Sequence, residues 1–175
     1  MELKCLAGTY TQYLFRRMVA ALCRGDIEDA LLSVSDDVEH VVNLDDARAD
    51  GEGAIRGKQM LGARLELMCN LFSFEAVVTD HLSAQQNVVR ARMKVKLAHC
   101  ETGQWLWTNF RFVVFQNGGL ITRIEQYHDT QYIAAFARMI GLSGRDGCQP
   151  RCIKPQFRIK PDPQMARRPN DTRPA

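Results

Sequence analysis

The chain has 175 residues, of which 46% are hydrophobic and 25% charged, and its formal net charge is +3. This length allows one domain with a sizeable core, and the composition excludes the low-hydrophobicity disordered class. No apolar run approaches the roughly 20 residues that a membrane helix needs, and the first ten residues lack the signal-peptide pattern. We therefore expect a cytoplasmic protein without a membrane partner, with its six cysteines as free thiols.

Charge and proline content divide the chain into two parts. Residues 145–175 contain all six prolines, with eight Lys or Arg against three Asp or Glu, whereas residues 1–144 carry fifteen against seventeen. We predict a folded domain over 1–144 and a basic, Pro-rich, disordered tail over 145–175, because the tail has few large apolar side chains to offset its ordering entropy. The tail is either a tether for an anionic partner or a solvated extension. Its single aromatic residue, Phe157, does not favour a nucleic-acid partner.

Apolar residues at helical spacing predict helices over residues 9–24, 27–34 and 58–69. Alternation of apolar and polar residues predicts a strand over 38–44, and the Asp- and Gly-rich stretch 45–57 predicts a long loop.

Four strand-like runs follow at 72–82, 87–99, 105–116 and 120–129, and a last helix is predicted over 130–141. Helices segregated from a long antiparallel sheet indicate an α+β domain. Because strands this long twist strongly, we expect a strongly curved antiparallel sheet wrapped around the N-terminal helices. Such a cone-shaped domain would enclose a central pocket for a small hydrophobic molecule.

The end of the last strand, Tyr127-His128-Asp129, is the first candidate site. Asp129 is either a pocket carboxylate that moves protons or the N-cap of the following helix. Alternation puts Tyr127 and Asp129 on one face and His128 on the other, so His128 either packs in the core or contacts a ligand from the opposite side.

His40 stands on the apolar face of the 38–44 strand and is either a hydrogen-bonded core residue or a pocket base. Trp107 alternates with Trp105 and Asn109 and so shares a strand face with them. This face either packs within the sheet, forms a dimer contact or serves as a platform for a ligand. Arg90, Arg92, Lys94 and Lys96 form a basic row, either an anion-binding stripe or a solvated face paired with Glu75 and Asp80.

Three segments together resemble a known family. They are RRMVAALCRGDIEDALLSVSDDVEHVV (16–42), AIRGKQML (54–61) and NGGLITRIEQYHDTQYIAAFARMIGL (117–142). The first resembles the opening of the SnoaL-like polyketide cyclase and ketosteroid isomerase-like group of the nuclear transport factor 2-like superfamily. The second resembles that group's helix entry, and the third its closing strand and helix. The resemblance covers about residues 9–142.

This resemblance implies roles for particular residues. Asp129 stands at the position of the cyclases' general acid/base, and Tyr13 near that of the isomerases' oxyanion-stabilising phenol. Asp45 or Asp46 stands where the isomerases place their base. The implied function is proton transfer next to the carbonyl of a small apolar molecule, in isomerase, cyclase or dehydratase chemistry.

Tyr13, His40 or Asn109 would steady the enolate oxygen, Trp107, Tyr127 and His128 would contact the substrate, and no metal or cofactor is expected. The alternative is a non-catalytic module of the same fold that binds a ligand or forms a homodimer through the sheet.

Overall fold

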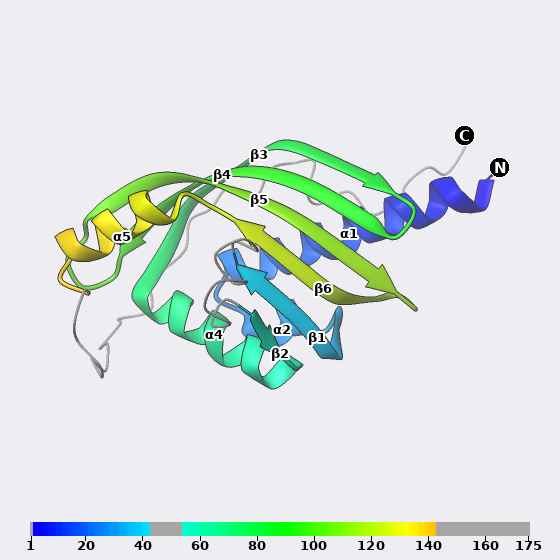
Figure 1. The fold of residues 1–175 in the computed structure, drawn as a ribbon, viewed down its shortest axis with the longest axis horizontal. Helices are drawn as coiled ribbons and strands as arrows, with labels where there is room; N and C mark the ends of the chain where they lie inside the picture. The colour runs from blue at the N-terminus through cyan, green and yellow to red at the C-terminus, as the bar shows by residue number, and fades with distance from the viewer. Residues whose placement is uncertain (1, 43–53, 143–175) are drawn as a thin grey trace, which may run out of the picture.

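The computed structural model describes residues 2–42 and 54–142, with side chains from residue 9 onward. The predicted tail, the loop carboxylates Asp45 and Asp46, and the cysteines Cys148 and Cys152 lie outside the described residues, and of Cys5 only the backbone is described. The helices are α1 (Glu2–Cys23), α2 (Ile27–Leu31), α4 (Lys58–Leu71) and α5 (Thr130–Met139). The strands are β1 (Val34–Val42), β2 (Ala54–Arg56), β3 (Phe72–Gln85), β4 (Val88–His99), β5 (Trp105–Asn117) and β6 (Leu120–Tyr127) (Figure 1).

The six strands form one sheet in the order β2-β1-β6-β5-β4-β3. All neighbours run antiparallel except β1 and β6, which run parallel, with His40 paired to Ile124. The sheet is therefore mixed, a feature that strand periodicity alone does not encode. The meander β3–β6 is antiparallel as predicted.

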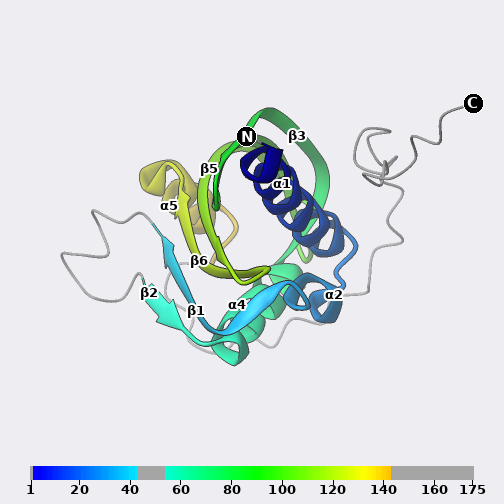
Figure 2. The same cartoon turned by 90° about the vertical axis from the view of Figure 1, so that its right-hand side faces the viewer.

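The long strands curl around α1, which lies on the concave side of the sheet (Figure 2). The buried face of α1 includes Leu14, Phe15 and Met18, and the Phe15 and Phe112 rings lie 5.8 Å apart. Thr11, 1% exposed, connects α1 to β5 by a hydrogen bond, in which its hydroxyl donates to Gln116 Oε1 at 3.2 Å. This arrangement is the predicted α+β domain with a strongly curved sheet around N-terminal helices.

The helix α4 closes another part of the concave side by packing on β1. Gly57 precedes this helix with φ +93°, a conformation that suits glycine, and its N–H donates to the Val38 carbonyl at 2.8 Å. Leu61, 1% exposed, enters the core from α4. The start of α4 is therefore fixed to the strand that carries His40.

Replacing Phe15 by Ala should lower the free energy of unfolding by about 3–5 kcal/mol, because the cavity would open between α1 and the sheet. Tyr10, which is 47% exposed on the same helix, provides the control, since Tyr10→Ala should change stability by about 0.5 kcal/mol or less. Urea unfolding followed by circular dichroism measures both. Equal losses for the two variants would contradict the packing described for α1.

Candidate functional site

Alternation along the strands separates two chemically different faces of the sheet. On β5, Leu106, Thr108 and Phe110 are buried, while Trp105 and Asn109, which stand at the alternate positions, are exposed. On β4, the buried residues likewise alternate with the basic row. We call the side that packs on α1 the inner face and the opposite side the outer face.

The inner face contains a small polar cluster at the adjoining ends of β1 and β6. His40, 5% exposed, is hydrogen-bonded to the Gln126 side chain. Gln126 Nε2 in turn lies 3.4 Å from His128 Nδ1, and the His128 ring meets the buried Phe110 ring edge-on, with centroids 5.6 Å apart. Two of the predicted site residues, His40 and His128, are thus connected through Gln126.

Arg64, on α4, places a positive charge near enough to His40 to affect its pKa. It is half-buried, but its Nη1 atom is fully buried. Neither Arg64 Nη1 nor His40 Nδ1 makes a hydrogen bond within residues 2–42 and 54–142. A buried polar atom without a partner costs about 1–3 kcal/mol of folding free energy, so two such atoms lower the stability of the fold.

The pKa of His40 is lowered to about 4. Burial is the main cause, because it disfavours the charged imidazolium, and the nearby Arg64 charge acts in the same direction. The hydrogen bond with Gln126 opposes both effects. At neutral pH the ring is therefore uncharged.

This lowered pKa predicts a pH-dependent stability. Because unfolded His40 binds a proton below about pH 6.5 and folded His40 only below about 4, stability is present above 6.5 and is lost as the pH falls between these values. The loss due to His40 should approach roughly 3 kcal/mol. Urea unfolding of wild type and His40→Gln at pH 7 and pH 4 isolates this contribution. A pH dependence unchanged in the variant would contradict it.

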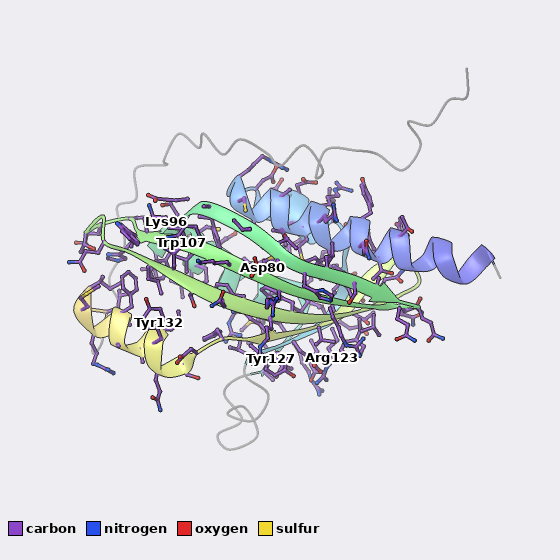
Figure 3. The ribbon with its side chains drawn as sticks, turned by 90° about the horizontal axis from the view of Figure 1, so that it is seen from above. Asp80, Lys96, Trp107, Arg123, Tyr127 and Tyr132 are labelled. Atoms are coloured by element: carbon purple, nitrogen blue, oxygen red, sulfur yellow. The ribbon has the colours of Figure 1, made fainter. Side chains whose placement is uncertain are left out.

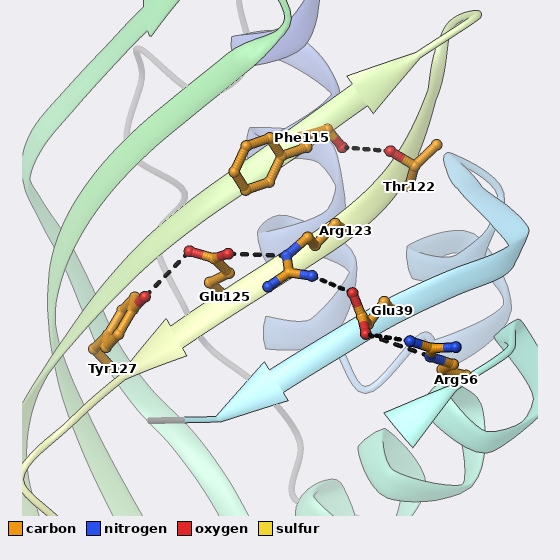
Figure 4. Close-up of polar contacts among 7 residues, drawn as sticks. All are labelled: Glu39, Arg56, Phe115, Thr122, Arg123, Glu125 and Tyr127. Carbon is orange, nitrogen blue, oxygen red and sulfur yellow. Dashed lines mark hydrogen bonds and ion pairs between the residues drawn. The ribbon is translucent and has the colours of Figure 1, made fainter. Parts of the chain in front are cut away.

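The outer face carries a chain of charged groups across β2, β1 and β6 (Figure 4). Arg56 bonds to Glu39, Glu39 to Arg123, Arg123 Nε to Glu125 Oε1 at 2.8 Å, and the Tyr127 hydroxyl donates to Glu125 Oε2 at 3.1 Å. Burial lowers the pKa of Arg123, but the bond to Glu125 and the charge of Glu39 outweigh it, so the net pKa is raised. Both carboxylates on this part of the outer face, Glu39 and Glu125, are therefore paired.

Further along the outer face, lysines lie over tryptophan rings. Figure 3 labels Lys96 and Trp107, which are paired across β4 and β5 at this end of the sheet. Lys94 Nζ is 5.2 Å from the Trp107 ring centroid, and Lys96 Nζ is 4.7 Å from that of Trp105. Lys96 also pairs with Glu75 at 2.6 Å, and Arg92 with Asp80 at 3.8 Å, as the solvated-face interpretation predicted. Trp107, Asn109 and Tyr127 therefore lie on the face away from His40.

Asp129 stands at the N-terminus of α5 and is exposed. Its Oδ1 accepts a hydrogen bond from the Tyr132 N–H at 2.9 Å, which is the predicted N-cap. Tyr13 is 38% exposed on α1 and stacks on Tyr10 with centroids 6.3 Å apart. Of the seven predicted site residues, His40 and His128 are joined through a shared partner, Gln126.

Sequence reasoning did not select Arg64 or Gln126. Arg64 nevertheless stands at an apolar-stripe position, because residues 61, 64, 65 and 68 are spaced i, i+3, i+4 and i+7. Gln126 is two residues after the buried Ile124, so alternation places it on the inner face. A polar residue at an inward position was the available signal in both cases.

Two open hollows lie along α4, of about 700 Å³ and 390 Å³. The larger is lined by residues such as Leu31, Asp36 and Glu66, and neither includes His40. Among the described residues, no three His, Cys, Asp or Glu side chains are grouped to hold a metal ion. No helix in that part of the chain is long and apolar enough to span a membrane.

No protein-family model matches the sequence, and no curated protein matches it either. Solved structures do. A protein described as a candidate SnoaL-like polyketide cyclase from Jannaschia sp. CCS1 aligns with TM-score 0.63 and 11% identity, covering 75% of this chain and 92% of its own. An LEH-like epoxide hydrolase from M. tuberculosis aligns with TM-score 0.60 and 17% identity, covering 76% of this chain and 97% of its own.

A nuclear transport factor 2-like protein from Burkholderia pseudomallei K96243 aligns with TM-score 0.62 and 17% identity, covering 75% of this chain and 98% of its own. The chain has the nuclear transport factor 2-like fold. The fold expected from the resemblance to SnoaL-like proteins is confirmed. Sequence identities this low support a shared fold but do not indicate a shared reaction.

Proposed function

We propose that this nuclear transport factor 2-like protein binds a small apolar, carbonyl-bearing molecule on the inner face and moves a proton next to the carbonyl. The observation that carries the proposal is His40, a buried imidazole whose Nδ1 makes no hydrogen bond within the described residues. Its pKa of about 4 keeps it neutral and able to accept a proton at pH 7. Neighbours described as a polyketide cyclase and an epoxide hydrolase support small-molecule chemistry.

The proposed step uses few groups. With His40 Nε2–H donating to Gln126 Oε1, the Nδ1 lone pair takes the proton from the carbon beside the carbonyl. The C–H electron pair forms a C=C bond, and the carbonyl π pair moves onto oxygen to give an enolate. The Arg64 charge stabilises that oxygen, and return of the proton from Nδ1 to carbon completes the exchange or isomerisation. This step requires no metal or organic cofactor.

Asp129 is retained as a second acid/base at the end of β6. It lies one residue beyond His128, which belongs to the inner cluster, and the resemblance to SnoaL-like cyclases gives it this role. Because Asp129 Oδ1 caps α5, replacing this residue could affect both helix stability and proton transfer, and two substitutions are needed to distinguish these effects. Asn is as good an N-cap as Asp, whereas Ala should cost about 1 kcal/mol of stability.

The test uses 2-tetralone, an apolar bicyclic ketone, in deuterated buffer, with loss of the α-hydrogen signal followed by NMR. Wild type should exchange these hydrogens faster than buffer alone. In His40→Gln the part of the rate that exceeds the buffer rate should fall by about 10²-fold or more. If Asp129→Asn also loses exchange, Asp129 takes part; if it does not, its role is the cap. Exchange at the wild-type rate in His40→Gln would contradict the proposal.

We further propose that two copies of the chain pair through the outer face. Trp105 is 55% exposed and Val78 50% exposed there, an arrangement that suits an aromatic-rich interface. A two-fold axis near β5 would place the β4 cations of one copy over the Glu39 and Glu125 region of the other.

Trp105→Glu should convert such a dimer to a monomer in sedimentation velocity, because it puts a charge in the interface core. Tyr132→Glu is the matched control, since Tyr132 is 49% exposed but lies on α5. A wild-type monomer at the highest concentration measured would refute the pairing, and so would an unaltered dimer in Trp105→Glu.

A further inference from the structure

We propose that residues 151–160 of the chain bind in a groove between α2 and α4 of the same molecule. This segment has the sequence RCIKPQFRIK and lies outside the described residues. The groove consists of the two hollows along α4, which adjoin because Glu66 lines both. Neither hollow includes His40, so this interaction surface is independent of the proposed function.

The first reason is the apolar character of this side of α4. Gly62 is buried where the two helices meet, and a Cβ atom at this position would lie only 3.1 Å from Leu31 Cδ1. Beside the groove, the exposed residues Met60, Ala63 and Leu67 form an apolar row at positions i, i+3 and i+7 of α4. A helix side that faces only water usually carries polar residues there, so the row indicates a surface that another segment covers.

The second reason is the charge around the groove. The residues that line it include one lysine and four carboxylates, Asp26, Glu28, Asp36 and Glu66. Lys58 pairs with Asp36 at 3.5 Å, whereas Glu28 and Glu66 make no ion pair with another described residue. The groove is therefore negatively charged and favours a basic occupant.

The third reason is that the segment has the complementary pattern. It contains four cations and no carboxylate. Apolar residues stand at alternate positions, Ile153, Pro155, Phe157 and Ile159. The positions that follow them carry polar or basic residues, Lys154, Gln156, Arg158 and Lys160. An extended conformation would therefore turn an apolar side toward α4, while the long basic side chains reach the carboxylates at the rim.

The fourth reason is the place where the described chain ends. The Leu142 N–H donates to the Ala137 carbonyl at 2.9 Å, and the ring of the adjacent Phe136 lies 6.3 Å from that of Phe72, the residue after α4. The eight residues between Leu142 and the segment span up to about 28 Å when extended. The segment itself spans up to about 33 Å, and α4 is about 21 Å long. The chain is therefore long enough for its own segment to follow the groove from the last turn of α4 to the first.

The test is zero-length cross-linking of the full chain with a carbodiimide, which joins a lysine amine to a carboxylate that it contacts, followed by peptide mapping. Lys154 and Lys160 should form links to the carboxylates of the groove, Asp26, Glu28, Asp36 and Glu66. The Lys96–Glu75 pair, whose charged atoms lie 2.6 Å apart, provides the internal reference for the yield.

Arg151→Glu/Arg158→Glu reverses two charges of the segment and leaves both of its lysines available for reaction. The yield of groove links should fall about tenfold or more, because like charges would then face each other. Phe157→Ser keeps every charge and should lower the yield several-fold, because it removes an apolar contact. Arg167→Glu/Arg168→Glu is the matched control, since it makes the same change of charge outside the segment, and it should keep the wild-type yield.

The same experiment gives the results that would overturn the inference. An unchanged yield in Arg151→Glu/Arg158→Glu or in Phe157→Ser overturns the role of the segment. Links spread equally over Glu101, Asp80 and the acidic residues of 43–53 show a general attraction of the basic tail, and so does a yield lost equally in the control.

A mixture of ¹⁵N-labelled and unlabelled protein identifies the occupant. Groove links that join a labelled to an unlabelled peptide place the segment of a second copy in the groove and overturn binding within one chain. Absence of groove links while the Lys96–Glu75 link forms overturns the inference altogether. None of these outcomes bears on the proposed function.

Discussion

The packing of α1 into the curl of the sheet is the interaction on which the rest of the structure depends. Strands β3, β4 and β5 have 14, 12 and 13 residues, and strands of this length twist too strongly to remain flat. A curled sheet needs an apolar body on its concave side, and the helix face containing Phe15 provides it. Without α1, the inner face would expose its large apolar side chains to water.

This packing also decides which chemistry stands on which side of the sheet. Strand side chains alternate, so fixing one buried residue fixes its neighbours. On β1, burial of Val38 places His40 inside and Glu39 outside, and on β6, burial of Ile124 does the same for Gln126 and Glu125. A slip of one residue would exchange the two sets and bury the carboxylates. The parallel register of β1 with β6 is therefore what brings His40 to Gln126.

The sequence allowed most of the elements to be predicted, because period-two and period-3.6 patterns report directly on which face is buried. It placed His40 on the apolar face and offered two alternatives for Asp129, of which the structure displays the N-cap. It could not reveal that β1 pairs with β6 in parallel, since a strand's own alternation is the same whichever partner it has. Short β2, with three residues, gave too little pattern to separate it from the loop.

The inner cluster was harder to anticipate for a different physical reason. Arginine on a helix usually extends its charged end into water, so Arg64 resembled a surface residue until the helix was placed against β1. The outer ion pairs made by Arg56 and Arg92 involve largely exposed cations and contribute little each, whereas buried polar atoms without partners cost the fold free energy. A fold that already has a well-packed helix at its centre does not require that cost. That cost is present at His40 Nδ1 and Arg64 Nη1, whereas on the outer face Glu39 and Glu125 are both bonded. This difference is the reason why the proposed function is placed on the inner face.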